Sequence, residues 1–254
     1  MAYTKGANII NFTPRFFPFV AMFQIVLTAV RICDWVIYRV RITGRENLRA
    51  VPAAVIVSNH TLLFDPGIIA HAIRPRRTYF TMLEETALIP WLGTFVRLLG
   101  AIPIPDSPNA LRTLDSAART ALRLTGLIHF FPEGELYREN QEVYPFHPGA
   151  FLLACRLGVP VVPVTTVLHQ RLWRGKSAVR IGSRSFRLPP RLTIVIGTPV
   201  QPPVGTRVAS RAVREMAQQV RGIMQETIDR RGGCKSISRG LMPRLGRRPE
   251  QQSA

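Results

Sequence analysis

A histidine and a carboxylate five residues apart form the strongest candidate for chemistry in this sequence. His60 and Asp65 follow directly on an apolar run, residues 53–57. A carboxylate bonded to one imidazole nitrogen fixes the ring and leaves the other nitrogen free to take a proton from a substrate hydroxyl. We interpret His60 as a general base and Asp65 as its orienting partner. The alternative is a helix start that contains a histidine and an aspartate by chance.

A second candidate follows another short apolar run, residues 127–131. There, Glu133 could bind a substrate hydroxyl or orient a loop, and Gly134 permits a ligand to approach the backbone closely. Pro-Glu-Gly is also an ordinary turn sequence. If both runs are strands of one sheet, we expect the polar residues that follow them to converge on the same face of the domain.

The elements that must position these residues follow an α/β pattern. Strand-like apolar runs at 53–57, 127–131, 159–167 and 192–196 alternate with amphipathic stretches. Ser107-Pro108 offers a helix N-cap with proline in the first turn, and Gly126 ends that helix. A late helix is expected at 207–229. We predict a mixed sheet flanked by helices in an α/β domain of residues 42–231, followed by a basic disordered tail, residues 232–254.

The first 41 residues differ in character from this domain. Residues 16–30 are strongly apolar, but the run is shorter than the roughly 20 residues that a bilayer span needs. Trp35 and Tyr38 follow it, with arginines nearby, which favours a helical segment lying in the membrane interface. A buried helix and a tilted single span are the alternatives. With three widely separated cysteines, we expect the cytoplasmic face of a membrane, in monotopic or single-span attachment.

The chain is strongly basic, with a net charge of +19, and arginine supplies 31 of its 34 cations. The planar guanidinium suits phosphate groups, including those of lipids. No zinc, helix-turn-helix or RNA-binding signature is evident, so we expect a membrane lipid surface as partner and no nucleic acid. The sequence also indicates no metal and no cofactor.

Five segments carry a resemblance to a known family. Asn59-His60 with Asp65, and Phe131-Pro132-Glu133-Gly134, match the first and third motifs of the glycerolipid acyltransferases, which include 1-acylglycerol-3-phosphate acyltransferase. Residues 100–104 and 159–164 resemble the second and fourth motifs, and residues 145–150 resemble the segment after the third. Motif order and spacing are preserved from about residue 40 to residue 200.

The resemblance implies transfer of a fatty acyl group from acyl-CoA or acyl carrier protein, as co-substrate, to the hydroxyl of a lysoglycerolipid. The first candidate is 1-acylglycerol-3-phosphate, in phospholipid biosynthesis. Asn59, Glu133 and Gly134 would then contact substrate, and backbone amides near Gly134 would stabilise the oxyanion. Alternatives are an acyltransferase or transacylase for another lysolipid, such as a lysophospholipid or lyso-aminolipid, and a catalytically idle membrane-binding homologue.

Departures from the family pattern bear on the acceptor. Leu83, Ser107 and Leu136 stand where the family commonly has cations that could hold the acceptor phosphate. Arg97 and Arg138 lie close enough in sequence to compensate, and we include both as substrate-binding candidates. The resemblance therefore indicates the reaction more sharply than it indicates the acceptor headgroup.

Overall fold

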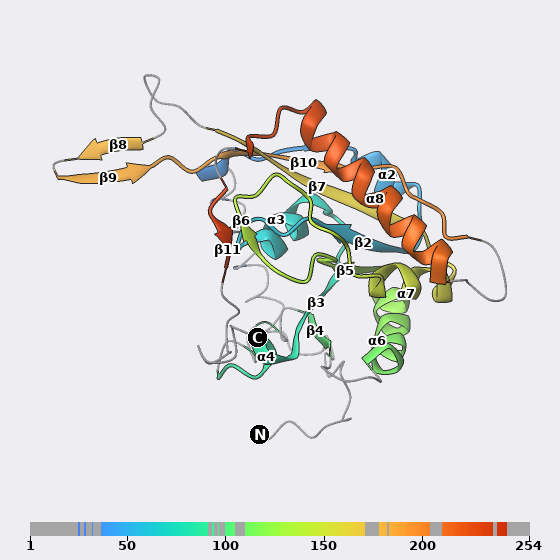
Figure 1. Ribbon diagram of the computed structural model, residues 1–254. Helices are drawn as coiled ribbons and strands as arrows, with labels where there is room; N and C mark the ends of the chain where they lie inside the picture. The colour runs from blue at the N-terminus through green and yellow to red at the C-terminus, as the bar shows by residue number, and fades with distance from the viewer. Residues whose placement is uncertain are drawn as a thin grey trace.

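A mixed seven-stranded sheet forms the centre of the molecule (Figure 1). The computed structural model describes residues 37–90, 100–104, 110–170, 178–181, 183–203, 210–235 and 238–242, with the single positions 25, 28, 32, 93 and 96. The strands of the sheet are β1 (Arg41–Thr43), β2 (Ala54–Ser58), β3 (Tyr79–Leu83), β4 (Ala101–Ile104), β5 (Leu127–Phe130), β7 (Val161–His169) and β10 (Arg191–Ile196). Their spatial order is β1-β10-β7-β2-β5-β3-β4.

β2 occupies the middle of this order, parallel to both β5 and β7. All five of its residues are buried, as expected for a strand covered on both faces. β10 runs antiparallel to β7, which makes the sheet mixed. The four strands predicted from apolar runs are present as β2, β5, β7 and β10, so the prediction of a mixed α/β sheet is confirmed.

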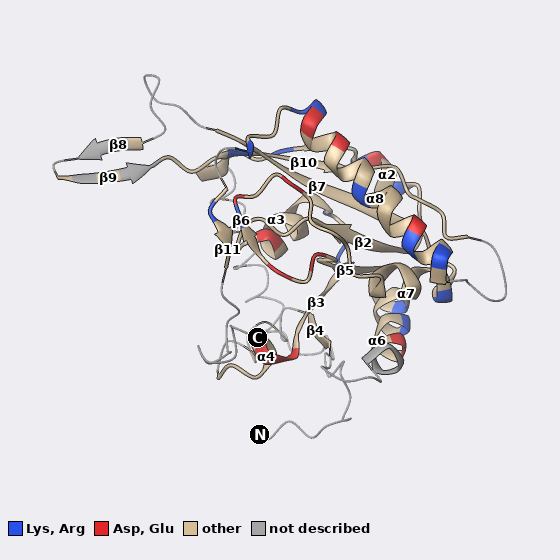
Figure 2. Cartoon of the chain, viewed as in Figure 1, with Lys and Arg blue, Asp and Glu red and all other residues tan. Residues whose placement is uncertain are grey.

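Helices cover both faces of the sheet. Alternate side chains of β2 point to opposite faces, and both sets are apolar, so each face is buried under helices. Val55 and Val57 pack with the helices α6 (Ala110–Thr125), α7 (Gly149–Leu157) and α8 (Ser210–Arg230). Ala54 and Ile56 pack instead with α2 (Arg45–Arg49) and α3 (Asp65–Ala72). Charged residues of both signs line the outer side of α8 (Figure 2). The two apolar faces of one strand thus hold the helical layers together.

Smaller elements extend from the sheet. The short helix α4 (Glu84–Ala87) follows β3, and a hairpin consists of β8 (Ala178–Ile181) and β9 (Arg184–Arg187). A two-residue strand, β6 (Tyr137–Arg138), pairs with β11 (Gly240–Leu241). β11 lies in the segment that we expected to be disordered from residue 232. Its backbone is fixed by two further bonds, from Arg239 N to Arg138 O and from Met242 N to Leu136 O, both 2.8 Å.

The N-terminal apolar segment, residues 16–30, lies outside the described residues except at positions 25 and 28. Arg97, Ser107 and the basic stretch 171–177 also fall outside them. Among the helices that the structure does describe, none has the length and apolar character required to cross a bilayer.

Candidate active site

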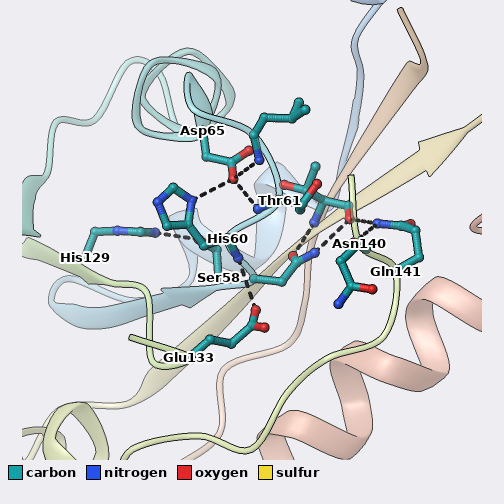
Figure 3. Close-up of polar contacts among 11 residues, drawn as sticks. Ser58, His60, Thr61, Asp65, His129, Glu133, Asn140 and Gln141 are labelled. Atoms are coloured by element: carbon teal, nitrogen blue, oxygen red, sulfur yellow. Dashed lines mark hydrogen bonds and ion pairs between the residues drawn. The ribbon is translucent and has the colours of Figure 1, made fainter. Parts of the chain in front are cut away.

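The site lies where β2 and β5 end side by side. The two strands are in parallel register, with Ile56 opposite His129 and Val57 opposite Phe130. The chain therefore leaves both strands at the same edge of the sheet and brings the residues after Ser58 close to those after Phe130. At this edge His60 Nδ1 lies 3.0 Å from Asp65 Oδ2 (Figure 3). The structure thus brings together the two residues that we predicted as base and orienting partner.

Asp65 fixes the loop as well as the histidine. Its Oδ2 also accepts hydrogen bonds from Thr61 N at 2.7 Å and from Leu62 N at 2.8 Å. The residue is fully buried and begins α3, where a negative charge is favoured by the helix dipole. One carboxylate oxygen thus holds three N–H groups and sets both the loop backbone and the ring orientation.

The ring of His60 is partly exposed to solvent. The side chain is 20% exposed and stacks on Phe131, with ring centroids 3.9 Å apart and planes inclined by 18°. Within the described part of the chain, no group hydrogen-bonds to His60 Nε2. With Nδ1–H donated to Asp65, Nε2 carries the lone pair that a general base requires.

Glu133 connects two of the loops that surround the histidine. Its Oε1 accepts from His60 N at 3.1 Å and its Oε2 from Tyr144 N at 3.3 Å. Burial raises the pKa of Glu133 from 4.5 to about 7, and the hydrogen bonds from these two amides oppose that rise. Of the two roles that we considered for Glu133, the geometry favours orientation of loops.

Gly134 adopts a backbone conformation that other residues resist. Its φ is +73°, and a Cβ at this position would lie 2.9 Å from His147 Cδ2. Its amide donates to Phe131 O at 3.1 Å and closes the turn. The Gly134 amide is therefore engaged within the protein, and the glycine allows the turn to pass closely beside His147.

The Asn59 amide binds the neighbouring strand, whereas we expected it to contact substrate. It bonds both backbone groups of one residue, with Thr166 N donating to Oδ1 at 2.8 Å and Nδ2 donating to Thr166 O at 3.0 Å. Asn59 is only 3% exposed. This contact arises because β7 continues beyond Val164, the last residue of β7 that is paired with β2.

Other groups complete the same unpaired edge of β7. Gln141 is fully buried; its Oε1 accepts from Leu168 N at 2.7 Å, and its Nε2 lies 3.3 Å from Thr166 O. Cys234 N donates to Leu168 O at 2.9 Å. Side-chain amides and a distant backbone amide thus take the place of a strand, which satisfies buried backbone groups that would otherwise be costly.

β6 places Arg138 beside the loop that contains His60. Tyr137 N donates to His60 O at 3.2 Å, and Glu139 N donates to Thr61 O at 2.8 Å. Arg138 itself is exposed, whereas Leu136, at the place of the family's arginine, is 9% exposed. The other candidate cation, Arg97, lies outside the described residues. No cluster of three or more His, Cys, Asp or Glu suited to a metal ion occurs among the residues described.

His129 is a further component of the site and lies within the apolar strand β5. It is fully buried, and its Nε2 lies 2.8 Å from Ser58 Oγ. Its ring contacts the Phe131 ring edge-on, with the two centroids 4.5 Å apart. His60 stacks on the same Phe131 ring. Burial lowers the pKa of His129 to about 3, with a further contribution from His60, so the ring is neutral at physiological pH. The signal in the sequence was a polar residue within an apolar run.

The sequence matches a known protein family. The sequence model of the family described as Acyltransferase matches residues 39–167, which include both site motifs and β7 up to Val167. The chain belongs to the Acyltransferase family. Its matched region contains His60, Asp65 and Glu133, together with Gln141, which the motifs do not include.

Several relatives are named as acyltransferases. A 1-acyl-sn-glycerol-3-phosphate acyltransferase of Chlamydomonas reinhardtii is 32% identical over 170 residues, 65% of this chain and 48% of the relative. One from Saccharomyces cerevisiae is 26% identical over 208 residues, 80% of this chain and 64% of the relative. A human lysophospholipid acyltransferase is 26% identical over 153 residues, 56% of this chain and 28% of the relative. The chain thus spans about half of the length of the Chlamydomonas relative and just under two thirds of the length of the yeast relative.

A solved structure shares the fold. The crystal structure of the 1-acyl-sn-glycerophosphate (LPA) acyltransferase PlsC from Thermotoga maritima superposes with a TM-score of 0.59 and 20% sequence identity. The alignment covers 84% of this chain and 81% of the other. The two proteins therefore share the arrangement of the sheet and its helices.

Proposed function

We propose that this protein is an O-acyltransferase that moves a fatty acyl group from a thioester donor to the hydroxyl of a lysoglycerolipid. One observation carries the proposal: His60 Nδ1 is bonded to the buried Asp65 carboxylate, and Nε2 is left open at the end of β2. This is the arrangement of a general base that is held in one tautomer.

In the proposed reaction, His60 Nε2 removes the proton of the acceptor hydroxyl as the oxygen attacks the thioester carbonyl. The resulting imidazolium is stabilised by Asp65. Collapse of the tetrahedral intermediate breaks the carbon–sulfur bond and releases the thiolate of coenzyme A or acyl carrier protein, which takes up the proton. A new ester remains on the acceptor, and the enzyme itself forms no covalent bond with the acyl group.

For the acceptor we propose 1-acylglycerol-3-phosphate first, because the relatives from Chlamydomonas and yeast are named for it. Arg138, exposed beside the His60 loop, supplies a cation for its phosphate, and Arg97 remains a second candidate. The buried Leu136 supports an alternative: without an arginine at this position, a lysophospholipid with a larger headgroup also fits. The human relative is named a lysophospholipid acyltransferase.

We further propose that the protein works at the cytoplasmic face of a membrane. The apolar stretch 16–30 and the net charge of +19 support attachment to an anionic lipid surface. The division into a membrane-associated segment (1–41) and an acyltransferase domain (42–231) remains part of this proposal.

The test is release of free thiol from purified protein supplied with acyl-CoA or acylated carrier protein and a panel of lysolipids. His60→Ala should abolish thiol release, whereas His71→Ala, on α3, should leave it nearly unchanged. If His60→Ala is as active as the wild type, the proposed mechanism is wrong. Acyl transfer from a phospholipid without any thioester would indicate a transacylase instead.

A further inference from the structure

Two large apolar side chains project into solvent from the loop that holds the catalytic pair. Leu63 is 51% exposed and Phe64 is 63% exposed, and both lie between His60 and Asp65 in sequence. The preceding residue, Leu62, is only 8% exposed and belongs to the apolar cluster beneath α2 and α3. The loop therefore anchors itself through one leucine and presents the next two side chains outward.

This exposure is enforced by the bonds that orient His60. Asp65 Oδ2 accepts from Thr61 N and Leu62 N, and Asp65 N donates to Leu62 O at 3.1 Å. Ile68 N donates to Phe64 O at 3.1 Å, which fixes the start of α3. Turning Leu63 and Phe64 inward would break these bonds. Their contact with water is thus a consequence of the catalytic geometry and is unfavourable until something apolar covers them.

The surroundings indicate what covers them. β6 and the residue after it are bonded to the same loop through Tyr137 N and Glu139 N, and β6 carries the exposed Arg138. Opposite Tyr137 on β11 lies Leu241, which is 54% exposed. Apolar side chains beside arginine, in a protein with a net charge of +19, are the composition of a surface that lies in the headgroup region of an anionic bilayer.

We propose that Leu63 and Phe64 insert into the interfacial region of an anionic phospholipid bilayer. The insertion places the open Nε2 of His60 at the depth of the acceptor hydroxyl, so that the loop that orients the base also sets its position relative to the lipid surface. The docking surface is separate from the N-terminal apolar segment in sequence. This proposal depends on the proposed function only in the experiment that measures acyl transfer.

The first experiment presents one lysolipid acceptor in two forms. The long-chain form is embedded in vesicles of phosphatidylcholine and phosphatidylglycerol, and the short-chain form is monomeric in solution. The double variant Leu63→Ser/Phe64→Ser should lose about tenfold or more in rate on vesicles, as expected when two half-exposed apolar side chains leave the interface. Its rate with the monomeric acceptor should remain within about twofold of wild type.

Leu124 provides the matched control. It is 55% exposed and lies on α6, which packs on the face of the sheet opposite to α3 (Figure 1). Leu124→Ser should leave both rates unchanged. Equal losses on both acceptors in the double variant would mean that Leu63 and Phe64 hold the substrate chain, and unchanged rates would mean that they touch nothing; either result overturns the proposal.

A second experiment needs no activity, so it separates this proposal from the proposed function. Phe64→Trp should add fluorescence that brominated phosphatidylcholine in phosphatidylglycerol-containing vesicles quenches, whereas Leu124→Trp should add fluorescence that it does not quench. Equal quenching of the two variants overturns the proposal. A wild-type dimer that becomes monomeric in the serine double variant, measured by sedimentation without lipid, would assign the surface to a second copy of the chain and would also overturn it.

Discussion

Asp65→Asn tests the central geometry because it changes charge while keeping shape. The carboxylate oxygen Oδ2 accepts three hydrogen bonds, whereas Oδ1 is buried and has no hydrogen-bond partner among the described residues. If the amide oxygen of asparagine takes the Oδ2 place, the three donors keep an acceptor but the NH₂ is buried unpaired. If the amide flips, its NH₂ faces three N–H donors. The first arrangement is favoured, and it lacks the negative charge beside His60.

The magnitude follows from these bonds. A neutral acceptor in place of a charged one weakens the bond to His60, and the imidazolium formed during attack loses its ion pair. Together we expect a loss of about 3–5 kcal/mol in transition-state stabilisation, or roughly 10²- to 10⁴-fold in kcat. The unpaired NH₂ should reduce the free energy of unfolding by about 1–3 kcal/mol, so the variant should still fold.

The assay is thiol release at saturating donor and acceptor, with KM for each substrate and thermal unfolding measured alongside. The matched control is Asp115→Asn on α6, whose carboxylate pairs with Arg119 at 2.8 Å and Arg156 at 3.6 Å away from the site. It should keep nearly full kcat. A folded Asp65→Asn protein with kcat within about fivefold of wild type, or one impaired only in KM, would refute our assignment of Asp65 as the partner that stabilises the imidazolium.

Three further predictions follow from the site. Gly134→Ala should lower the free energy of unfolding by about 1–3 kcal/mol, because φ is +73° and the new Cβ would clash with His147. Adding His147→Ala removes the clash but not the backbone strain, so chemical unfolding should show that only part of this loss is recovered. Asn59→Ala should cost about 2–4 kcal/mol by leaving Thr166 N and O unpaired, while Asn59→Gly would cost at least as much; an unchanged urea midpoint would contradict this. The pKa of His129 is lowered from 6.5 to about 3, so its neutral state contributes stability that is present above pH 6.5 and lost as the pH falls toward 3, at up to about 1.4 kcal/mol per pH unit. His129→Gln should show a correspondingly flatter decline in urea titrations between pH 7 and pH 4, and parallel curves would show that this histidine does not govern acid stability.

The layout of the fold was predictable because buried strands have a direct signature. β2 and β7 are largely apolar and almost fully buried, and the polar residues after β2 mark the point where the chain leaves the sheet. The pairing of His60 with Asp65 was predictable for a similar reason, since both residues lie in one short connection between a strand and a helix. Local spacing constrains local geometry well.

Contacts between distant segments were not predictable in this way. Asn59 bonds to Thr166, 107 residues away, and nothing around Asn59 distinguishes that partner from a substrate. Gln141 meets Leu168 across 27 residues of a loop and a helix without any motif. β11 escaped prediction because a strand of only two residues, Gly240 and Leu241, has no pattern of its own in the sequence and depends on pairing with β6. These positions depend on tertiary pairing, which periodicity does not reveal.

The unpaired end of β7 has a consequence for how the protein behaves in a crowded solution. An exposed row of backbone N–H and C=O groups is a template on which a strand of another molecule can pair. Asn59 and Gln141 occupy this template at Thr166 and Leu168, so foreign chains find no free hydrogen-bonding groups there. Asn59 and Gln141 therefore also oppose intermolecular β-pairing, and with it aggregation, at the edge of the sheet beside His60.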